Sequence, residues 1–339
     1  MVLIGIDPHK GSHTAVVIDG HETQLAELRL RSSMHQCDQL LEWALAFPER
    51  RWAIESAGGL GYLLAQQLVA AGEEVVDVPP TLSSRVRVLG SGKAQKNDPN
   101  DALSTAIAAL RGRRLRRVGL DDHVAIIRLL ANRQHDLVAH HTQAVCRLHA
   151  QLANLSAGGV CGRLSPARAE ALLATINPLD GVVAARKQQC LELVADVVRL
   201  RASLADMRAR IQVAVLAANT SVTDVYGVGP IVAAIIIGHS GDVTRFASRN
   251  HYASYNATAP IEASSGPTKR HRLNQRGNRQ LNHAMHLAAV TQIGHDSPGR
   301  AYYQRKIAEG KSTKEAMRAL RRKISDAVYR QLLADAARR

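Results

Sequence analysis

Hydrophobic and polar positions divide the chain into an alternating first part and a helical remainder. Short apolar runs bounded by turn residues, which are typical of buried strands, occur at residues 2–7, 13–20, 23–30, 51–55 and 74–78. Helical spacing lies between them at 34–47 and 62–71, and a basic stretch rich in Gly and Ser at 85–96 is expected to form a surface loop. Five strands with interleaved helices predict an α/β layer fold.

A helical period dominates the chain beyond residue 98. One helix is expected to run to about residue 110, and the pattern from about 122 to 217 predicts a long, coiled-coil-like antiparallel helical arm with a connector at 156–165. Its apolar stripes are more typical of a core or a dimer seam than of a cofactor site. They comprise Leu129, Leu137, Val138, Val145, Leu148 and Leu152, then Leu191, Val194, Val198, Leu204, Met207 and Ile211.

The last part begins near residue 219 and opens on a Gly-x-Gly sequence, Gly227 to Gly229. Such a turn occurs in the hairpin of a helix-hairpin-helix, where glycines let backbone amides approach a DNA phosphate. An ordinary turn is an equally good interpretation. Further helices are expected at 233–238, at 281–292 and from 302 onward, with a small-residue loop at 256–267. The predicted domains are therefore 1–118, 119–218 and 219–339.

Positive charge indicates a polyanionic partner. The 339 residues carry 44 Lys and Arg against 29 Asp and Glu, a net charge of +15, and 46% are hydrophobic, so the chain is globular. Nucleic acid is the expected ligand, and with only 3% aromatic residues, contacts to backbone phosphates are favoured over base stacking. The expected contacts are Arg111, Arg113, Arg114, Arg116, Arg117, Gly227, Gly229, Lys269, Arg270, Arg272, Arg276 and Arg279.

Other classes of site and partner find little support. The four cysteines are scattered without a C-x-x-C pair, which argues against a zinc knuckle and fits reduced thiols in the cytoplasm. No apolar run of about 18 residues and no signal peptide is found, so a cytoplasmic, nucleoid-associated protein without membrane contact is expected. His283 and His286, three residues apart on an expected helix, lack a third metal ligand and are interpreted as surface or phosphate-facing residues.

Four acids are the candidate catalytic residues. Asp7 and Glu55 end predicted strands, and Asp98 and Asp101 open a predicted helix. Carboxylate oxygens suit Mg²⁺ or Mn²⁺, and two such ions can stabilise both oxygens of an in-line phosphoryl transfer. Simpler roles are also open: Asp98 as a helix N-cap with Asp101 facing the helix dipole, Asp7 as a turn residue, and Glu55 as a rim charge.

The motifs Gly5-Ile6-Asp7, Ile54-Glu55-Ser56-Ala57-Gly58 and Asn97-Asp98-Pro99-Asn100-Asp101-Ala102 resemble the DEDD motif of one family of bacterial insertion-sequence transposases. A second signature resembles the C-terminal transposase domain of that family: Gly227 to Pro230, Phe246, Tyr252-Ala253, Ser265-Gly266, Asn274 to Asn278 and Leu281-Asn282. The family more usually has Lys-Thr-Asp where this chain has Lys-Asn-Asp. The resemblance implies an RNase H-like (RuvC-like) N-terminal domain, then the helical arm and a mostly helical C-terminal domain.

The resemblance also implies a mechanism. Ser265 would attack a DNA phosphate and form a covalent phosphoserine link, with Ser264 as the less favoured alternative, while Mg²⁺ on Asp7, Glu55, Asp98 and Asp101 assists. A structured bridge RNA would pair with donor and target DNA, and the arm would support a dimer or tetramer with a shared site. Two alternatives are a RuvC-like endonuclease that uses water as the nucleophile and a non-catalytic nucleic-acid-binding scaffold.

Overall fold

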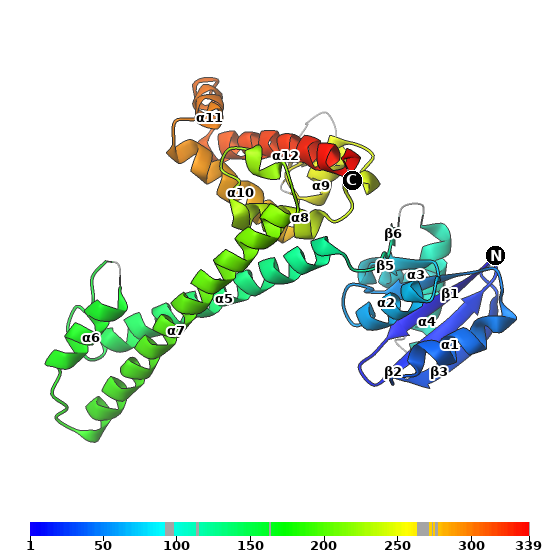
Figure 1. Ribbon diagram of the computed structural model, residues 1–339, viewed down its shortest axis with the longest axis horizontal. Helices are drawn as coiled ribbons and strands as arrows, with labels where there is room; N and C mark the ends of the chain where they lie inside the picture. Colours follow the sequence, from blue (N-terminus) through cyan, green and yellow to red (C-terminus); the bar gives the residue numbers. More distant parts are fainter. Residues whose placement is uncertain are drawn as a thin grey trace. The chain divides into compact units, whose positions relative to one another are not determined.

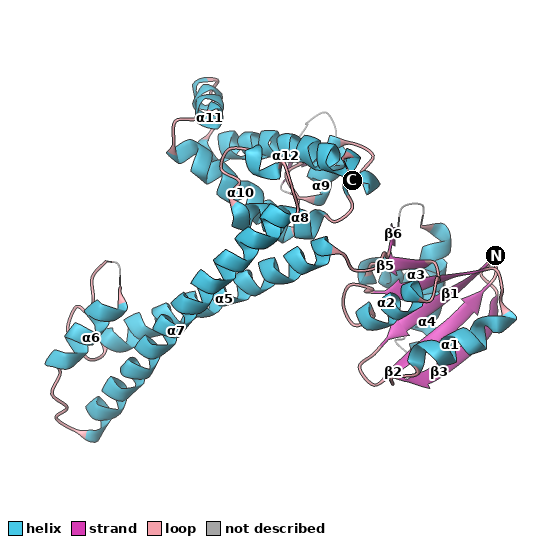
Figure 2. Ribbon diagram, viewed as in Figure 1, coloured by secondary structure: helices cyan, strands magenta, loops and turns pink. Residues whose placement is uncertain are grey.

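The computed structural model describes residues 1–91, 98–112, 115–162, 164–262, 271–272, 274 and 277–338. The chain divides into two compact units, Met1–Asp121 and Asp122–Arg339 (Figure 1). The first is built on a sheet, whereas the second is helical except for one short β ladder (Figure 2). Among the described helices, none combines the length and the apolar character needed to cross a membrane.

The sheet of the first unit has the order β3-β2-β1-β4-β5-β6. Its strands are β1 (Val2–Pro8), β2 (Ser12–Ile18), β3 (Gln24–Arg31), β4 (Arg50–Glu55), β5 (Val75–Val78) and β6 (Arg116–Arg117). The first three form an antiparallel meander, β4 and β5 continue parallel to β1, and β6 is antiparallel to β5. This order and mixture of directions is the RNase H-like arrangement, which confirms the predicted fold.

Alternation along β1 assigns each face of the sheet to different helices. Ile4 and Ile6 pack into the cluster that includes α1 (Gln36–Trp43) and α2 (Tyr62–Ala70). Leu3, on the other face, packs against α4 (Asp98–Arg111). Asp7 is an even number of residues from Leu3 and so shares the face that α4 covers. Along β1, the side chains on one face are therefore apolar, and the other face carries Asp7.

The predicted loop at 85–96 is wrong over its described part, because residues 80–91 form helix α3 (Pro80–Ser91). Pro80 opens the helix, and its missing N–H costs nothing in a first turn, where the N–H groups lack helical partners. Leu82 and Val86, four residues apart, pack against the cluster of Val76, Val78 and Ala108. This packing outweighs the weak helix propensity of the Ser- and Gly-containing sequence.

The second unit begins with the predicted antiparallel arm. Helix α5 (His123–Ala153) packs along α7 (Gly181–Ala217), and α6 (Pro166–Thr175) lies near the far end of the pair (Figure 1). His123 Nε2 lies 2.7 Å from the carbonyl oxygen of Ala214, so the start of α5 meets the end of α7.

The predicted apolar stripes of the arm are only partly correct. Leu137, Leu148 and Leu152 are buried, as are Val194, Leu204, Met207 and Ile211. In contrast, Leu129, Val138, Leu191 and Val198 are exposed. Ile127, Ala131 and Gln134 occupy the buried positions near the start of α5 instead. Residues seven positions apart drift gradually around a straight helix. A stripe that includes every apolar residue therefore also contains residues that do not face the partner helix.

The remainder of the second unit packs around the apolar helix α8 (Pro230–Ser240). The other helices of this part are α9 (Arg249–Tyr255), α10 (Arg279–Gly294), α11 (Pro298–Ala308) and α12 (Thr313–Ala337), with short 3₁₀ turns η2 (Val222–Asp224) and η3 (Val243–Arg245). A further 3₁₀ turn, η1 (Ala44–Ala46), belongs to the first unit. Strands β7 (Ile261–Glu262) and β8 (His271–Arg272) pair antiparallel, so part of the segment expected to be loop forms a ladder.

Gly227 has a packing role. Its φ is +82°, and a Cβ there would lie 2.7 Å from the carbonyl oxygen of Ala288 in α10. The neighbouring Tyr226 carbonyl accepts a 2.7 Å hydrogen bond from Gln292 Nε2. The left-handed backbone and the contact with α10 together explain this glycine. The phosphate-binding role of Gly227 and Gly229 stays a prediction.

Candidate active site

Asp7 and Glu55 lie at the same edge of the sheet because β1 and β4 are parallel neighbours. Ile6 pairs with Ile54, so the next residue of each strand is one of the two acids. Adjacent positions in register point to the same face of a sheet. The structure therefore places Asp7, which is 7% exposed, beside Glu55. Ser56 follows with φ +53°, which turns the chain sharply after the second acid.

Gly5 brings the other two acids to this edge. A Cβ at Gly5 would lie 2.2 Å from the carbonyl oxygen of Ala102 and 2.6 Å from the nitrogen of Ala106. Only a residue without a side chain lets the α4 backbone approach β1 this closely. Asp98 and Asp101 lie in the first turn of α4, where the helix dipole favours carboxylates. The close crossing thus accounts for the position of both acids near Asp7.

A cleft of about 360 Å³ opens between these elements. Asp7, Glu55 and Asp101 line it, together with Pro8, His9, Ser56, Leu60, Pro80, Ser84 and Arg87. Asp98 is not part of this lining but remains close, because ligand atoms of Asp7, His9 and Asp98 all lie within 4.8 Å of one another. The structure therefore gathers all four predicted acids around one site within the first unit.

His9 is a site residue that the sequence reasoning missed. Its Nδ1 lies 3.6 Å from Asp7 Oδ2, and its Nε2 lies 4.0 Å from Asp98 Oδ1. Pro8-His9-Lys10 has the composition of a turn, and no motif marks the histidine. Its position two residues after a strand-end acid was the available signal. His9 adds an imidazole to a set of carboxylate ligands.

Three carboxylates of the site already have partners. Arg87 forms an ion pair with Asp101, and Arg29 Nη2 lies 3.4 Å from Asp98 Oδ2. Ser83 Oγ donates a 3.0 Å hydrogen bond to Glu55 Oε1. Asp7 differs, since its Oδ2 is buried and accepts no hydrogen bond from the described residues. One buried carboxylate oxygen is thus left to a cation from outside the protein.

Burial raises the pKa of Asp7 to about 6. His9 opposes this shift, while Glu55, Asp101 and Asp98 reinforce it through like-charge repulsion. A buried carboxylate that is costly to ionise binds a divalent cation readily, because the cation offsets both the negative charge of that carboxylate and its repulsion by the neighbouring acids. The donor set therefore fits an oxygen-preferring divalent metal ion such as Mg²⁺ or Mn²⁺.

The remaining predicted site residues are divided between described and undescribed parts of the chain. Arg113, Arg114, Ser264, Ser265, Lys269, Arg270 and Arg276 lie outside the described residues, and Arg272 lies in β8. Three arginines of the first basic stretch form ion pairs within the first unit: Arg111 with Glu22, Arg116 with Asp77 and Arg117 with Glu74. Exposed pairs of this kind are weak and do not prevent phosphate binding.

Two family models match the chain, and the first of them extends through α5 of the arm. Residues 4–156 match a transposase family of the IS110 DEDD type, and residues 219–304 match the transposase family IS116/IS110/IS902. The first match contains all four acids, and together the two cover more than half of the chain. The fold and the matched motifs define the protein as a transposase.

Curated relatives extend the match over nearly the whole chain. An insertion element IS116 uncharacterized 44.8 kDa protein of Streptomyces clavuligerus is 27% identical and covers 98% of this chain and 94% of its own length. An insertion element IS900 uncharacterized 42 kDa protein of Mycobacterium paratuberculosis is 25% identical, with coverages of 98% and 95%. The chain belongs to the IS116/IS110/IS902 family of insertion-element transposases.

Among solved structures, Thermus thermophilus RuvC in complex with a Holliday junction substrate is similar to part of the chain. It is 18% identical, with a TM-score of 0.28, and the match covers 35% of this chain and 99% of the RuvC chain.

Proposed function

We propose that this transposase cuts and rejoins donor and target DNA through a serine nucleophile assisted by divalent metal ions. The gathering of Asp7, Glu55, Asp98 and Asp101 around one cleft, in a chain of this family, supports the proposal most directly. Ser265 is assigned as the nucleophile from the motif that the C-terminal part shares with the family. Ser264 is the alternative at the adjacent position.

In the proposed reaction, Ser265 Oγ attacks a phosphodiester phosphorus as its proton leaves to a base. A phosphorus–oxygen bond to serine forms, and the bond to the DNA 3′ oxygen breaks. The phosphoserine link conserves the energy of the broken bond, so a new 3′ hydroxyl can attack the same phosphorus and release the serine without ATP. Cutting and rejoining are therefore chemically symmetric.

Asp7, Glu55, Asp98 and Asp101 are the residues that would hold Mg²⁺ or Mn²⁺, with His9 in reach of the same position. A bound divalent ion supplies stabilisation of charge on the phosphoryl oxygens, and two such ions are proposed. The protein contributes rigidity: strand ends hold two acids, and the α4 crossing at Gly5 holds the other two. Arg87 and Arg29 form ion pairs with Asp101 and Asp98 and so place positive charge beside these two carboxylates.

Sequence choice is proposed to reside in a structured bridge RNA that pairs with both DNA partners, as the family resemblance implies. The arm at 119–218 is proposed as the device that joins subunits into a dimer or tetramer, between a DEDD domain at 1–118 and a serine-bearing domain at 219–339. Copurification tests the RNA partner. RNA recovered with the protein after a high-salt wash should form two loops complementary to the element's junctions, and its absence would oppose this part of the proposal.

Trapping of a covalent protein–DNA adduct tests the nucleophile. Ser265→Ala should abolish an adduct that survives denaturing electrophoresis, whereas Ser264→Ala, a matched change at the next residue, should retain it. Both variants should bind DNA as the parent protein does, which shows that each has folded. Loss of the adduct only in Ser264→Ala would move the assignment by one residue.

A water nucleophile is the second candidate, because the acids lie within one unit and could act without the serine. Under this mechanism, Ser265→Ala would still nick DNA in Mg²⁺ and no adduct would form with the parent protein. Under the non-catalytic scaffold, neither the parent protein nor Asp7→Asn would cleave DNA, and both would bind it equally.

A further inference from the structure

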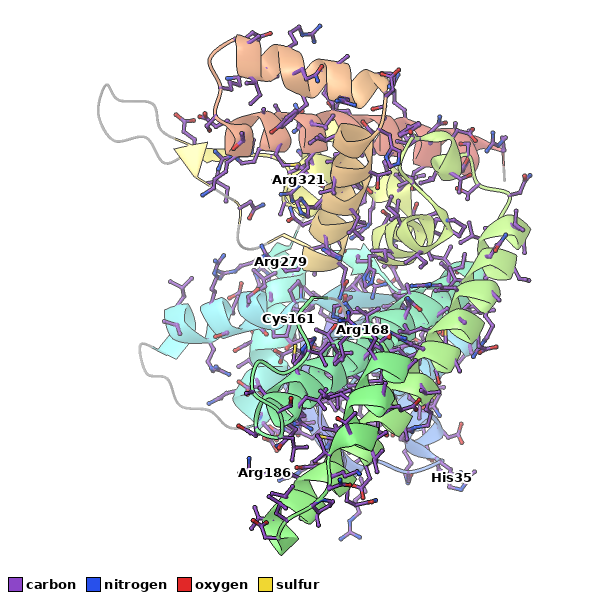
Figure 3. All side chains as sticks on the ribbon, turned by 90° about the vertical axis from the view of Figure 1, so that its left-hand side faces the viewer. His35, Cys161, Arg168, Arg186, Arg279 and Arg321 are labelled. Atoms are coloured by element: carbon purple, nitrogen blue, oxygen red, sulfur yellow. The ribbon has the colours of Figure 1, made fainter. Side chains whose placement is uncertain are left out.

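Positive side chains gather where α10 packs against α12 in the second unit. Arg279 is the first residue of α10, and Arg318 and Arg321 lie three residues apart on α12. Arg279 and Arg321 are labelled in Figure 3. Burial lowers the pKa of Arg321, and the charges of Arg279 and Arg318 lower it further. Burial and the positive charge of Arg321 also lower the pKa of His286 in α10, so the cluster extends along both helices.

Among the described carboxylates, Glu315 of the first turn of α12 lies near Arg318, whereas no ion pair is found for Arg279 or Arg321. The acids of α12 that form ion pairs do so elsewhere, Asp326 with Arg322 and Asp335 with Arg338. The sequence from residue 263 to 295 contains no Asp or Glu, while it holds Arg279 and four other Lys or Arg. The undescribed residues of this stretch therefore add positive charge only. The positive charges outnumber the one nearby carboxylate, and like charges brought together repel one another, so the arrangement favours an anion.

Arg321 is held in place but incompletely satisfied. Its Nη2 donates a 3.1 Å hydrogen bond to the carbonyl oxygen of Asn282. Its Nε is buried and has no hydrogen-bond partner among the described residues. A half-buried guanidinium without a carboxylate is costly, and its planar donors match the oxygens of a phosphate.

Asn282 also connects the cluster to the segment that carries Ser265. Its Nδ2 donates to the carbonyl oxygens of Asn256 and Ala257, at 3.2 and 3.1 Å, shortly before β7. Strands β7 and β8 pair on either side of residues 263–270 in the sequence. A single side chain thus links Arg321 to the residues that precede β7.

We propose that Arg279, Arg318 and Arg321 form a binding site for a backbone phosphate of nucleic acid, linked through Asn282 to the residues that precede β7. The phosphate-binding property stands on the cluster itself. Its position next to the reacting phosphate rests on the proposed function, and it deepens that function by giving the serine half-site its own electrostatic support. DNA is the expected ligand, and RNA offers the same phosphodiester chemistry.

The salt dependence of binding tests the site. Full-length protein in EDTA is titrated with labelled duplex DNA, and with duplex RNA of the same sequence, over a range of salt concentrations. Arg318→Gln and Arg321→Gln should each reduce the magnitude of the log–log salt slope by about 1, because one phosphate contact is lost. Arg330→Gln, an exposed position on the same helix, is the matched control and should keep the parent slope.

A slope change on either nucleic acid supports the site and identifies which one it holds. Unchanged slopes on both overturn the proposal. Thermal unfolding provides a second readout and checks folding: inorganic phosphate, compared with chloride at equal ionic strength, should stabilise the parent and Arg330→Gln more than Arg321→Gln. Equal stabilisation of all three contradicts the site.

Because no chemistry occurs in EDTA, these results are independent of the adduct assay. A reduced salt slope of binding in the arginine variants, together with a retained adduct in Ser265→Ala, supports the phosphate site and rejects the serine assignment. Loss of the adduct in Ser265→Ala with unchanged slopes in the arginine variants does the reverse.

Discussion

The acidic cleft of the first unit and the basic cluster of the second are opposite in charge and similar in design. The cleft gathers four carboxylates around a buried Asp7 oxygen that accepts no hydrogen bond from the described residues. The cluster gathers three arginines around a buried Arg321 nitrogen without a partner. Each unit thus keeps like charges together on a rigid scaffold, a choice that costs stability and is useful when a ligand of the opposite charge binds. Under the proposed function, the comparison teaches that the two units would hold different parts of one reaction, a metal ion in the first and a phosphate in the second.

Asp7→Asn gives the largest expected effect and separates the two regions. DNA cleavage and adduct formation should fall by at least about 10³-fold, which corresponds to about 4 kcal/mol of lost transition-state stabilisation. The salt slope of DNA binding should not change, because the basic cluster is intact. Asp38→Asn, at an exposed position of the same unit, is the control. Normal cleavage by Asp7→Asn would remove the cleft from the reaction.

The pH dependence of stability gives the next effect. The pKa of Asp7 is about 6 in the folded protein against 3.8 as the ordinary value, so the folded state holds the proton more tightly. Without metal, the stabilising contribution of the neutral carboxyl is complete below pH 4 and is lost as the pH rises through about 6, by up to about 3 kcal/mol.

Chemical unfolding of the parent protein and Asp7→Asn in EDTA measures this difference from pH 4 to 7. The variant should gain stability relative to the parent as the pH rises, and Mg²⁺ should restore the parent. A difference that stays constant over this range would contradict the unpaired charge in the cleft.

Gly5→Ala tests the geometry of the cleft. The added Cβ meets backbone atoms of α4, which cannot rotate away, so the helix must shift at a cost of about 1–3 kcal/mol. Stabilisation by Mg²⁺ should weaken with it, while the salt slope stays. Gly20→Ala, at a turn with no atom within 4 Å of the added Cβ, should behave as the parent does. Equal unfolding midpoints for the two variants would show that α4 does not need this close crossing.

His9→Ala gives the smallest effect and sharpens the ligand set. Loss of one ligand or neighbouring imidazole should weaken Mn²⁺ affinity about 10-fold, as for supporting residues at other metal sites. His35→Ala, an exposed histidine of the same unit, should leave the affinity unchanged. Calorimetric titration measures both. Equal affinity in His9→Ala would restrict the site to the carboxylates.

Much of the first unit could be predicted from its sequence, because strand alternation and turn residues act locally. Helix α3 could not, since its arginines and small residues resemble a loop and only the packing of Leu82 and Val86 makes it helical. The second unit showed the same limit in the arm, where the seam depends on the partner helix rather than on one apolar stripe.

The four acids gather as their order in the sequence suggested, because strand ends and a helix start converge on one edge of the sheet, and their catalytic role stays a prediction. Two features depended on contacts distant in sequence and were missed. Arg87 pairs with Asp101, although its stretch suggested a surface loop. Arg318 and Arg321 lie close together in sequence, but nothing in their spacing shows that they face Arg279 of another helix.

The close crossing of α4 over Gly5 has a consequence during synthesis on the ribosome. The first carboxylate leaves the exit tunnel early, whereas the helix that completes its surroundings emerges some ninety residues later. A nascent chain that ends before α4 therefore lacks two of the acids and the helix that encloses them. Under the proposed function, the metal-binding centre is therefore incomplete until the polypeptide has passed Arg111.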